Sequence, residues 1–334
     1  MPQNRHVKIG YKLTSEEFSA RELVRFARAA EEHGFSFASI SDHFHPWTDR
    51  QGQSPFVWSV IGGIAQATSK LVVGTGVTCP TFRTHPVIIA QAAATAATMM
   101  PGRFFLGVGT GENLNEHIVG QGWPEIEVRQ ERLAEAVEIM RKLWQGGQQS
   151  HRGKYFTVEN ARIYSMPDAP PPVLIAAAGE KSVELAAELG DGLIATHPDR
   201  ELVQKFRENA GEDKPCHGEL PVCFDPDERK AQKIAHEVWP VAGLPGQLFS
   251  ELPLPSLFEK AANLVTVEQV AKLVPCGPDP EKHLQGIREY INAGFDHIFV
   301  HQIGPNQEGF MDFYAKEILP RISAEVNGRG LQAA

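Results

Sequence analysis

A unit made of a helix, a glycine, a short apolar strand and a polar strand end occurs three times in this chain of 334 residues. The helical stretches end at Gly34, Gly190 and Gly294, and the strands after them lead to Asp42 and His43, to His197 and to His301. Glycine just past a helix end supplies the left-handed residue that closes the helix. A helix followed by a strand, repeated along the chain, predicts βα units and a parallel sheet.

The expected strands are mostly continuous apolar runs, as strands buried on both faces should be. We expect eight of them, at residues 7–12, 35–40, 71–77, 104–108, 173–177, 193–196, 221–224 and 297–300. Eight such units predict a (β/α)8 TIM barrel, and an open doubly wound sheet, the alternative, would be unusually long. The apolar spacing also predicts a helix over 129–144, and Ser19 with Glu22 predicts a capping box at the start of an earlier helix.

We expect one barrel domain over residues 1–334, because barrels of this length are common as single domains. Residues 239–257 interrupt the pattern with four prolines and little periodicity. Long irregular loops in compact domains are often lids or binding loops. We therefore expect an insertion or lid loop near the C-terminal face of the barrel, with a plain surface excursion as the alternative.

Charge and composition exclude several classes of partner. A net charge of -9 argues against a nucleic-acid partner, which would need a basic face. The longest mainly apolar run, 87–100, is too short to span a bilayer, and the polar start has no apolar signal segment. Four cysteines without a CxxC pair are typical of reduced intracellular thiols. We expect a cytoplasmic protein that forms a homodimer and binds a small molecule, with no nucleic acid and no membrane as partners.

The segment 42–47 follows an expected strand and contains Asp42, His43, His45 and Trp47. Catalytic groups of a β/α barrel lie at the C-terminal ends of its strands. Histidine is a natural general base near neutral pH. The alternatives are that Asp42 caps a turn, that His43 is a surface histidine and that Trp47 only packs.

A second cluster, 107–115, follows the expected strand 104–108. Its glycine-rich turn lacks the Lys-Ser/Thr of a P-loop, but the Glu112 carboxyl could exchange a proton with the nitrogen of a ring. The alternative is that Glu112 only begins a helix. The small residues at 176–179 would let a ligand lie against the backbone, and the amides at the start of the following helix could bind a phosphate. The alternative is that these small residues only allow tight packing between strand and helix.

A metal site is a further alternative, because His43, His45, His197 and His301 all follow strands. A metal-dependent hydrolase of this kind usually needs an acid at a late strand end. The last expected strand has none, since Gln302 follows His301. We therefore expect no metal.

Three motifs taken together, at 41–47, 74–83 and 107–116, resemble the deazaflavin-dependent glucose-6-phosphate dehydrogenase group of the luciferase-like superfamily. The resemblance extends over roughly residues 7–322. It implies a luciferase-like barrel that binds coenzyme F420 at its C-terminal face and transfers a hydride, while the protein manages orientation and protons.

The resemblance also assigns roles to individual residues. It implies that His43 accepts the hydroxyl proton, that Glu112 protonates N1 of the deazaflavin and that Trp47 helps to hold the intermediate. It implies a non-proline cis peptide at Gly76–Val77. The implied cofactor contacts are Asp42, Gly76, Val77, Cys79 (where the group usually has threonine), Asn115, Ala176, Ala177, Ala178 and Gly179.

The expected substrate pocket departs from that group. Thr196 is retained beside His197. At the three positions where that group has a cation to hold the sugar phosphate, this chain has residues 198–199 (Pro-Asp), Phe249 and Leu273. A phosphate dianion needs charge-assisted donors. We therefore expect an F420-dependent dehydrogenase or reductase that acts on a neutral or lipophilic alcohol or an unphosphorylated sugar. The alternatives are a sugar-phosphate dehydrogenase, a flavin-dependent luciferase-like monooxygenase, a metal-dependent hydrolase and a non-catalytic ligand-binding barrel.

Overall fold

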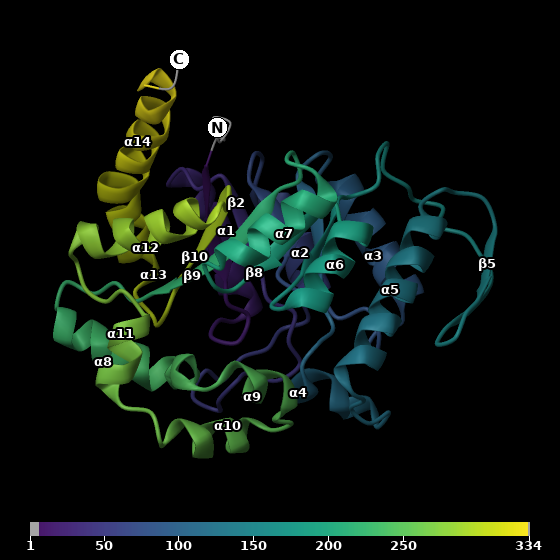
Figure 1. Ribbon diagram of the computed structural model, residues 1–334, viewed down its shortest axis with the longest axis horizontal. Helices are drawn as coiled ribbons and strands as arrows, with labels where there is room; N and C mark the ends of the chain where they lie inside the picture. Colours follow the sequence, from purple (N-terminus) through teal and green to yellow (C-terminus); the bar gives the residue numbers. More distant parts are fainter. Residues whose placement is uncertain (1–6, 333–334) are drawn as a thin grey trace.

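The strands form a closed parallel barrel with helices around it (Figure 1). The structure, a computed structural model, describes residues 7–332. Neighbouring strands follow the order β1-β10-β9-β8-β7-β4-β3-β2, which confirms the expected (β/α)8 barrel. The bounds are β1 (Lys8–Leu13), β2 (Phe37–Ile40), β3 (Val72–Thr75), β4 (Phe104–Val108), β7 (Val173–Ala176), β8 (Gly192–Ala195), β9 (Cys216–Val222) and β10 (His297–Gln302).

The helices fall into an outer layer and a set of additions. The layer around the barrel comprises α1 (Ala20–Glu32), α2 (Val57–Ala67), α3 (Pro86–Met99), α5 (Ile126–Leu143), α6 (Glu180–Leu189), α7 (Arg200–Ala210), α12 (Pro280–Ala293), α13 (Gln307–Phe313) and α14 (Leu319–Gln332). A π-helical turn at Tyr314–Ile318 joins α13 to α14, which projects from the body (Figure 1). None of the helices within residues 7–332 is long and apolar enough to cross a membrane.

The barrel interior is filled rather than hollow. Phe37, Phe105 and Phe299 pack there with Leu174 and Ile194. Gly74 makes room for one of these rings, because a Cβ at that position would lie 2.2 Å from Phe105. A packed interior leaves no passage through the barrel, so a ligand site must lie at one of its ends.

Two of the three glycines that define the repeat have the expected conformation. Gly34 and Gly294 are left-handed, with φ of 88° and 102°. The expectation is wrong for Gly190, which has φ -88°. Glycine is still needed there for space, since a Cβ would lie 2.6 Å from the Ala186 carbonyl oxygen. At the start of α1, the Glu22 carboxylate accepts hydrogen bonds from both the backbone and the hydroxyl of Ser19, as expected.

Several expected boundaries are corrected by the structure. The seventh strand, expected at 221–224, is β9 (Cys216–Val222), and the helix expected at 129–144 is α5. The apolar pattern misplaced β9 because its inward positions are polar, with His217 and Glu219 facing the interior. The strand expected at 71–77 ends at Thr75, where the Gly76–Val77 bond is cis as the resemblance implied. An antiparallel hairpin, β5 (Gln149–Arg152) and β6 (Thr157–Ala161), was not expected.

The proline-rich segment 239–257 is mainly helical, which corrects the expectation of an irregular loop. It contains the 3₁₀ helix η2 (Pro240–Gly243), α9 (Gly246–Glu251) and the start of α10 (Pro255–Ala262), between α8 (Glu228–Val238) and α11 (Val267–Leu273). Prolines begin η2 and α10, where their missing N–H is not needed. Figure 1 shows α9 and α10 together beside α4 (Asn113–Glu116).

Candidate active site

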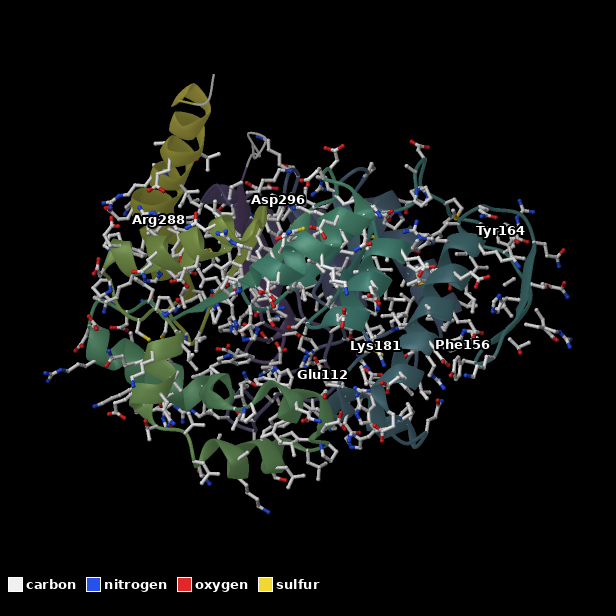
Figure 2. The ribbon with its side chains drawn as sticks, viewed as in Figure 1. Glu112, Phe156, Tyr164, Lys181, Arg288 and Asp296 are labelled. Carbon is white, nitrogen blue, oxygen red and sulfur yellow. The ribbon has the colours of Figure 1, made fainter. Side chains whose placement is uncertain are left out.

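The expected catalytic residues gather at the C-terminal end of the barrel. His43 follows β2, and Glu112 follows β4 as the residue before α4. Figure 2 shows Glu112 in the region between the barrel and the α9–α10 side of the insertion. Asp296, at the start of β10, marks the opposite end of the barrel (Figure 2).

The His43 ring is buried and has acceptors on both sides. Its Nδ1 lies 3.1 Å from the carbonyl oxygen of His45, which can only accept, so Nδ1 carries a proton. Its Nε2 lies 3.4 Å from the Glu16 carboxylate and 3.6 Å from the Glu112 carboxylate. Nε2 is therefore the ring atom that can take up or release a proton between two carboxylates.

Glu16 is a site residue that the sequence reasoning missed. It lies three residues beyond the end of β1, is 4% exposed and accepts a hydrogen bond of 2.6 Å from the Ser41 hydroxyl. Ser41 also bonds to Ser15, so the carboxylate is held by a buried polar group. The position of Glu16 just past a strand was the one sequence signal that could have identified it.

The Asp42 carboxylate is held on both of its oxygens. Thr78 donates to it at 2.7 Å and Arg83 at 2.9 Å. Arg83 also lies 3.7 Å from the buried carboxylate of Glu116 and donates its backbone N–H to it. Burial raises the pKa of Glu116 to about 7, although the Arg83 charge opposes the shift. The Asp42 and Glu116 carboxylates thus both pair with the Arg83 guanidinium.

Asn115 joins the two catalytic segments. Its amide oxygen accepts from the backbone N–H groups of Phe44 and His45, at 2.8 and 3.1 Å. Its amide nitrogen donates to Glu112 at 2.9 Å. The side chain expected to contact the cofactor therefore also fixes Glu112 relative to the segment that carries His43.

Small residues line the end of the barrel beside these groups. A Cβ on Gly76 would lie 2.0 Å from the Ser39 hydroxyl, and one on Gly109 would lie 2.8 Å from Val77. Ala176 and the exposed Ala178 and Gly179 continue this surface after β7. The two glycines thus let the strand ends pack closely, and the short side chains after β7 add little bulk there. Together with the proton-handling side chains of His43 and Glu112, this set of residues fits a deazaflavin.

Three expected cofactor contacts have partners within the protein. The buried Cys79 thiol lies 3.1 Å from the Thr81 hydroxyl, and burial raises the pKa of that thiol above its usual range. At the start of α6, the Ser182 hydroxyl accepts from the amides of Ala178 and Gly179 at 3.1 and 3.0 Å. A phosphate at this helix start would have to displace the Ser182 hydroxyl.

Aromatic side chains of the insertion and of α10 surround Trp47. The ring centroids of Phe249, Phe258 and Trp239 lie 5.0, 5.2 and 6.2 Å from that of Trp47. Trp47 in turn lies 5.0 Å from the His43 ring. The expected pocket residue Phe249 thus contacts Trp47, which in turn contacts the candidate base His43.

The other expected substrate residues lie elsewhere. Thr196 and His197 are exposed after β8 and bond to each other at 3.0 Å. Leu273 ends α11 and is 57% exposed, so it is not packed into the aromatic group around Trp47. Within residues 7–332, no three His, Cys, Asp or Glu side chains are grouped to hold a metal ion.

A buried histidine between two carboxylates, at the C-terminal end of a (β/α)8 barrel, is the arrangement of an enzyme that transfers protons. Comparison with known proteins makes this more specific. Residues 6–297 match the model of the luciferase-like monooxygenase family. The chain belongs to this family, which confirms the expected resemblance.

Its relatives include F420-dependent glucose-6-phosphate dehydrogenases. Those of Mycobacterium avium (strain 104) and Mycolicibacterium fortuitum are 37% and 38% identical over 330 residues, covering 95% of this chain and 98% of theirs. A solved F420-dependent secondary alcohol dehydrogenase, in complex with an F420-acetone adduct, is 31% identical with a TM-score of 0.88. It covers 95% of this chain and 99% of its own. The F420-dependent tetrahydromethanopterin reductase of Methanopyrus kandleri, at 22% identity and TM-score 0.77, shares the fold.

Proposed function

We propose that the chain is a coenzyme F420-dependent oxidoreductase that interconverts a neutral, apolar alcohol and its carbonyl compound. The observation that carries the proposal is the position of the His43 Nε2 atom between Glu16 and Glu112, with the His43 ring packed against Trp47. We refer to Trp47 and the aromatic side chains around it as the aromatic wall. The names of the relatives that are more than 30% identical, F420-dependent glucose-6-phosphate dehydrogenases and an F420-dependent secondary alcohol dehydrogenase, support the cofactor and the reaction class.

The protein residues supply the proton chemistry of this reaction. When bound, the deazaflavin accepts or donates the hydride. The His43 Nε2 atom takes the hydroxyl proton during oxidation, while the His45 carbonyl keeps the ring oriented through Nδ1. The Glu112 carboxylate, 3.6 Å away, can receive this proton from His43, and Asn115 holds it in place for that exchange.

The wall around Trp47 supports an apolar substrate. Its members Trp239, Phe249 and Phe258 offer rings and no formal charge. The two arginines that border the insertion are already paired, Arg129 with Glu251 at 3.0 Å and Arg50 with Glu237 at 2.7 Å. A phosphate dianion in this region would compete with those carboxylates, whereas an alkyl group would bury apolar surface.

The cofactor is tested by titrating the protein with F420 and, separately, with FMN while following ligand fluorescence. We expect saturable F420 binding that is clearly tighter than FMN binding. FMN binding of equal or greater affinity would reject the deazaflavin assignment and favour a flavin-dependent monooxygenase.

A sugar-phosphate dehydrogenase is the second candidate, because the names of the 37%-identical relatives favour it. The two candidates differ in the rate of F420 reduction with glucose-6-phosphate and with secondary alcohols at equal concentration. Efficient reduction by glucose-6-phosphate alone would select the second candidate over the first.

We also propose that the protein works in the cytoplasm as a homodimer. All four cysteines lie within the described residues as buried free thiols, which suits a reducing compartment. The α3 helix is apolar on most sides and exposes Ile88 and Met99, and Phe56 is exposed before α2. Light scattering after gel filtration tests the dimer, and Ile88→Glu should shift it toward the monomer if α3 forms the interface.

A further inference from the structure

Four charged side chains form a buried group at the same end of the barrel, outside the set that handles the proton. Glu17 follows β1, Lys12 lies on β1, Glu219 on β9 and His301 on β10. The His301 ring nitrogens lie 3.5 Å from Glu17 and 3.3 Å from Glu219, and Glu219 lies 3.3 Å from the Lys12 ammonium. We refer to these four residues as the charge cluster.

The charge cluster is balanced and largely removed from water. The Lys12 ammonium and the His301 ring face two carboxylates, and the side chains of Lys12, Glu17 and His301 are at most 6% exposed, with Glu219 at 16%. A buried ion cluster is weak evidence for stability, because the loss of hydration offsets much of the attraction. This balance points to a role for the cluster in placing a particular group.

The group that the charge cluster reaches is a backbone carbonyl at the end of β3. The Lys12 ammonium donates to the Gly76 carbonyl oxygen at 2.8 Å and lies 5.3 Å above the Phe299 ring. Three neighbours thus fix the ammonium: the Glu219 carboxylate, the Gly76 carbonyl and an aromatic face. Gly76 directly follows β3, at the same end of the barrel as His43 and Glu112.

We propose that Lys12 and Glu219 are positioning residues, which hold the Gly76 carbonyl and with it the backbone on which the deazaflavin ring rests. The inference rests on the proposed function. Glu219 orients the Lys12 ammonium, and His301, between Glu17 and Glu219, keeps Glu219 in place. For this role, none of the side chains of Lys12, Glu219 and His301 needs to exchange a proton with the substrate.

The first test compares the F420 affinity of Lys12→Met with that of the wild-type protein. Losing a charge-assisted hydrogen bond that orients the backbone should weaken F420 binding by ~10–100-fold. Lys8→Met is the matched control, since Lys8 is exposed on the same strand at the opposite end of the barrel, and it should bind F420 as the wild type does. Unchanged affinity of Lys12→Met would overturn the proposal.

Lys12→Met also leaves Glu219 without its cation, so a second variant separates charge balance from positioning. The double variant Lys12→Met/Glu219→Gln removes one charge of each sign. Its thermal stability should recover toward wild type while its F420 affinity stays weak. If the affinity recovers together with the stability, the cluster only balances charge and the proposal is wrong.

A measurement without cofactor keeps the proposal separate from the proposed function. Amide hydrogen exchange of peptides that cover residues 76–79 should be faster in the double variant than in wild type and in Lys8→Met. Equal exchange in all three proteins would overturn the positioning role. A wild-type protein that fails to bind F420 would overturn the proposed function and leave this exchange comparison valid.

Discussion

At the scale of single residues, the tautomer of His43 decides which atom can do chemistry. The His45 carbonyl fixes the proton on Nδ1 and leaves Nε2 facing Glu16 and Glu112. A base held this way has little freedom to rotate, because Trp47 also packs against its ring. The histidine is therefore placed for one proton transfer rather than for general polar contact.

Replacing His43 should separate catalysis from binding. His43→Gln keeps a polar side chain but cannot accept the hydroxyl proton, so hydride transfer from the alcohol should slow by ~10²–10⁴. Stopped-flow reduction of F420 measures this rate, and fluorescence titration should give an F420 affinity close to wild type. Reduction at the wild-type rate would remove His43 from the role of base.

The sequence was informative for residues that follow a recognisable apolar strand. His43 and Glu112 were both found in this way, because their strands are continuous apolar runs. Glu16 was missed, since no motif surrounds it and its partner His43 is 27 positions away in the chain. The Asp42–Arg83 pair was missed for the same reason: the pairing exists only once β2 and β3 are neighbours.

At the scale of elements, the insertion is the part of the fold that sequence patterns described least well. Its helices are short, and prolines begin two of them, so no period of 3.6 residues could emerge. The same limit applied to β9, whose inward His217 and Glu219 hide the apolar signature of a strand. A search for apolar runs therefore misses a barrel strand whose inward-facing side chains are polar.

The aromatic wall should control which substrates are accepted. Phe249→Lys would place a charge against Trp47, so kcat/KM for an apolar secondary alcohol should fall by ~10-fold or more. Leu264→Lys is the control, because Leu264 lies in the connection between α10 and α11 and is 83% exposed. Equal loss in both variants, or no loss in Phe249→Lys, would show that the wall does not contact the substrate.

Glu251 should hold the insertion against the barrel. Its carboxylate pairs with Arg129, which is 4% exposed, and its carbonyl accepts from Asn113 at 2.9 Å. Glu251→Gln leaves the Arg129 charge without its partner, so stability should fall by ~1–3 kcal/mol and amide exchange in α9 should rise. Chemical denaturation and exchange mass spectrometry measure the two effects.

Glu237→Gln provides the comparison for that variant. The Glu237–Arg50 pair joins α8, just before the insertion, to the segment after β2, but both side chains are more than half exposed. A pair of this kind contributes ~0–1 kcal/mol, so little should change. If the two variants behave alike, the buried position of Arg129 does not matter to the closure of the insertion.

At the scale of the whole molecule, the charge cluster links stability to pH. Burial alone would lower the pKa of His301, but Glu17 and Glu219 raise it from 6.5 to about 9. A histidine whose pKa is raised by folding contributes stability that is complete below 6.5 and is lost as the pH rises through about 9. The unfolding free energy should therefore decline across this window.

His301→Gln identifies the source of that decline. The variant should show a flatter dependence of unfolding free energy on pH between 6.5 and 9 than the wild type, in urea denaturation at constant ionic strength. Identical slopes in the two proteins would mean that His301 is not protonated in the folded barrel. Lys12 and His301 hold the pKa of the Glu219 carboxyl down from 4.5 to about 2 against the effect of burial, so its contribution to stability should be lost as the pH falls from 4.5 through about 2.

The reaction proposed for this barrel is hydride transfer between a neutral alcohol and F420, with His43 as the base. It is tested most directly by mixing the purified protein with oxidised F420 and a panel of neutral secondary alcohols, with glucose-6-phosphate in parallel, and following the deazaflavin absorbance. We expect bleaching with at least one neutral alcohol, faster than with glucose-6-phosphate and largely lost in His43→Gln. Bleaching with glucose-6-phosphate alone, or bleaching that His43→Gln leaves intact, would contradict it.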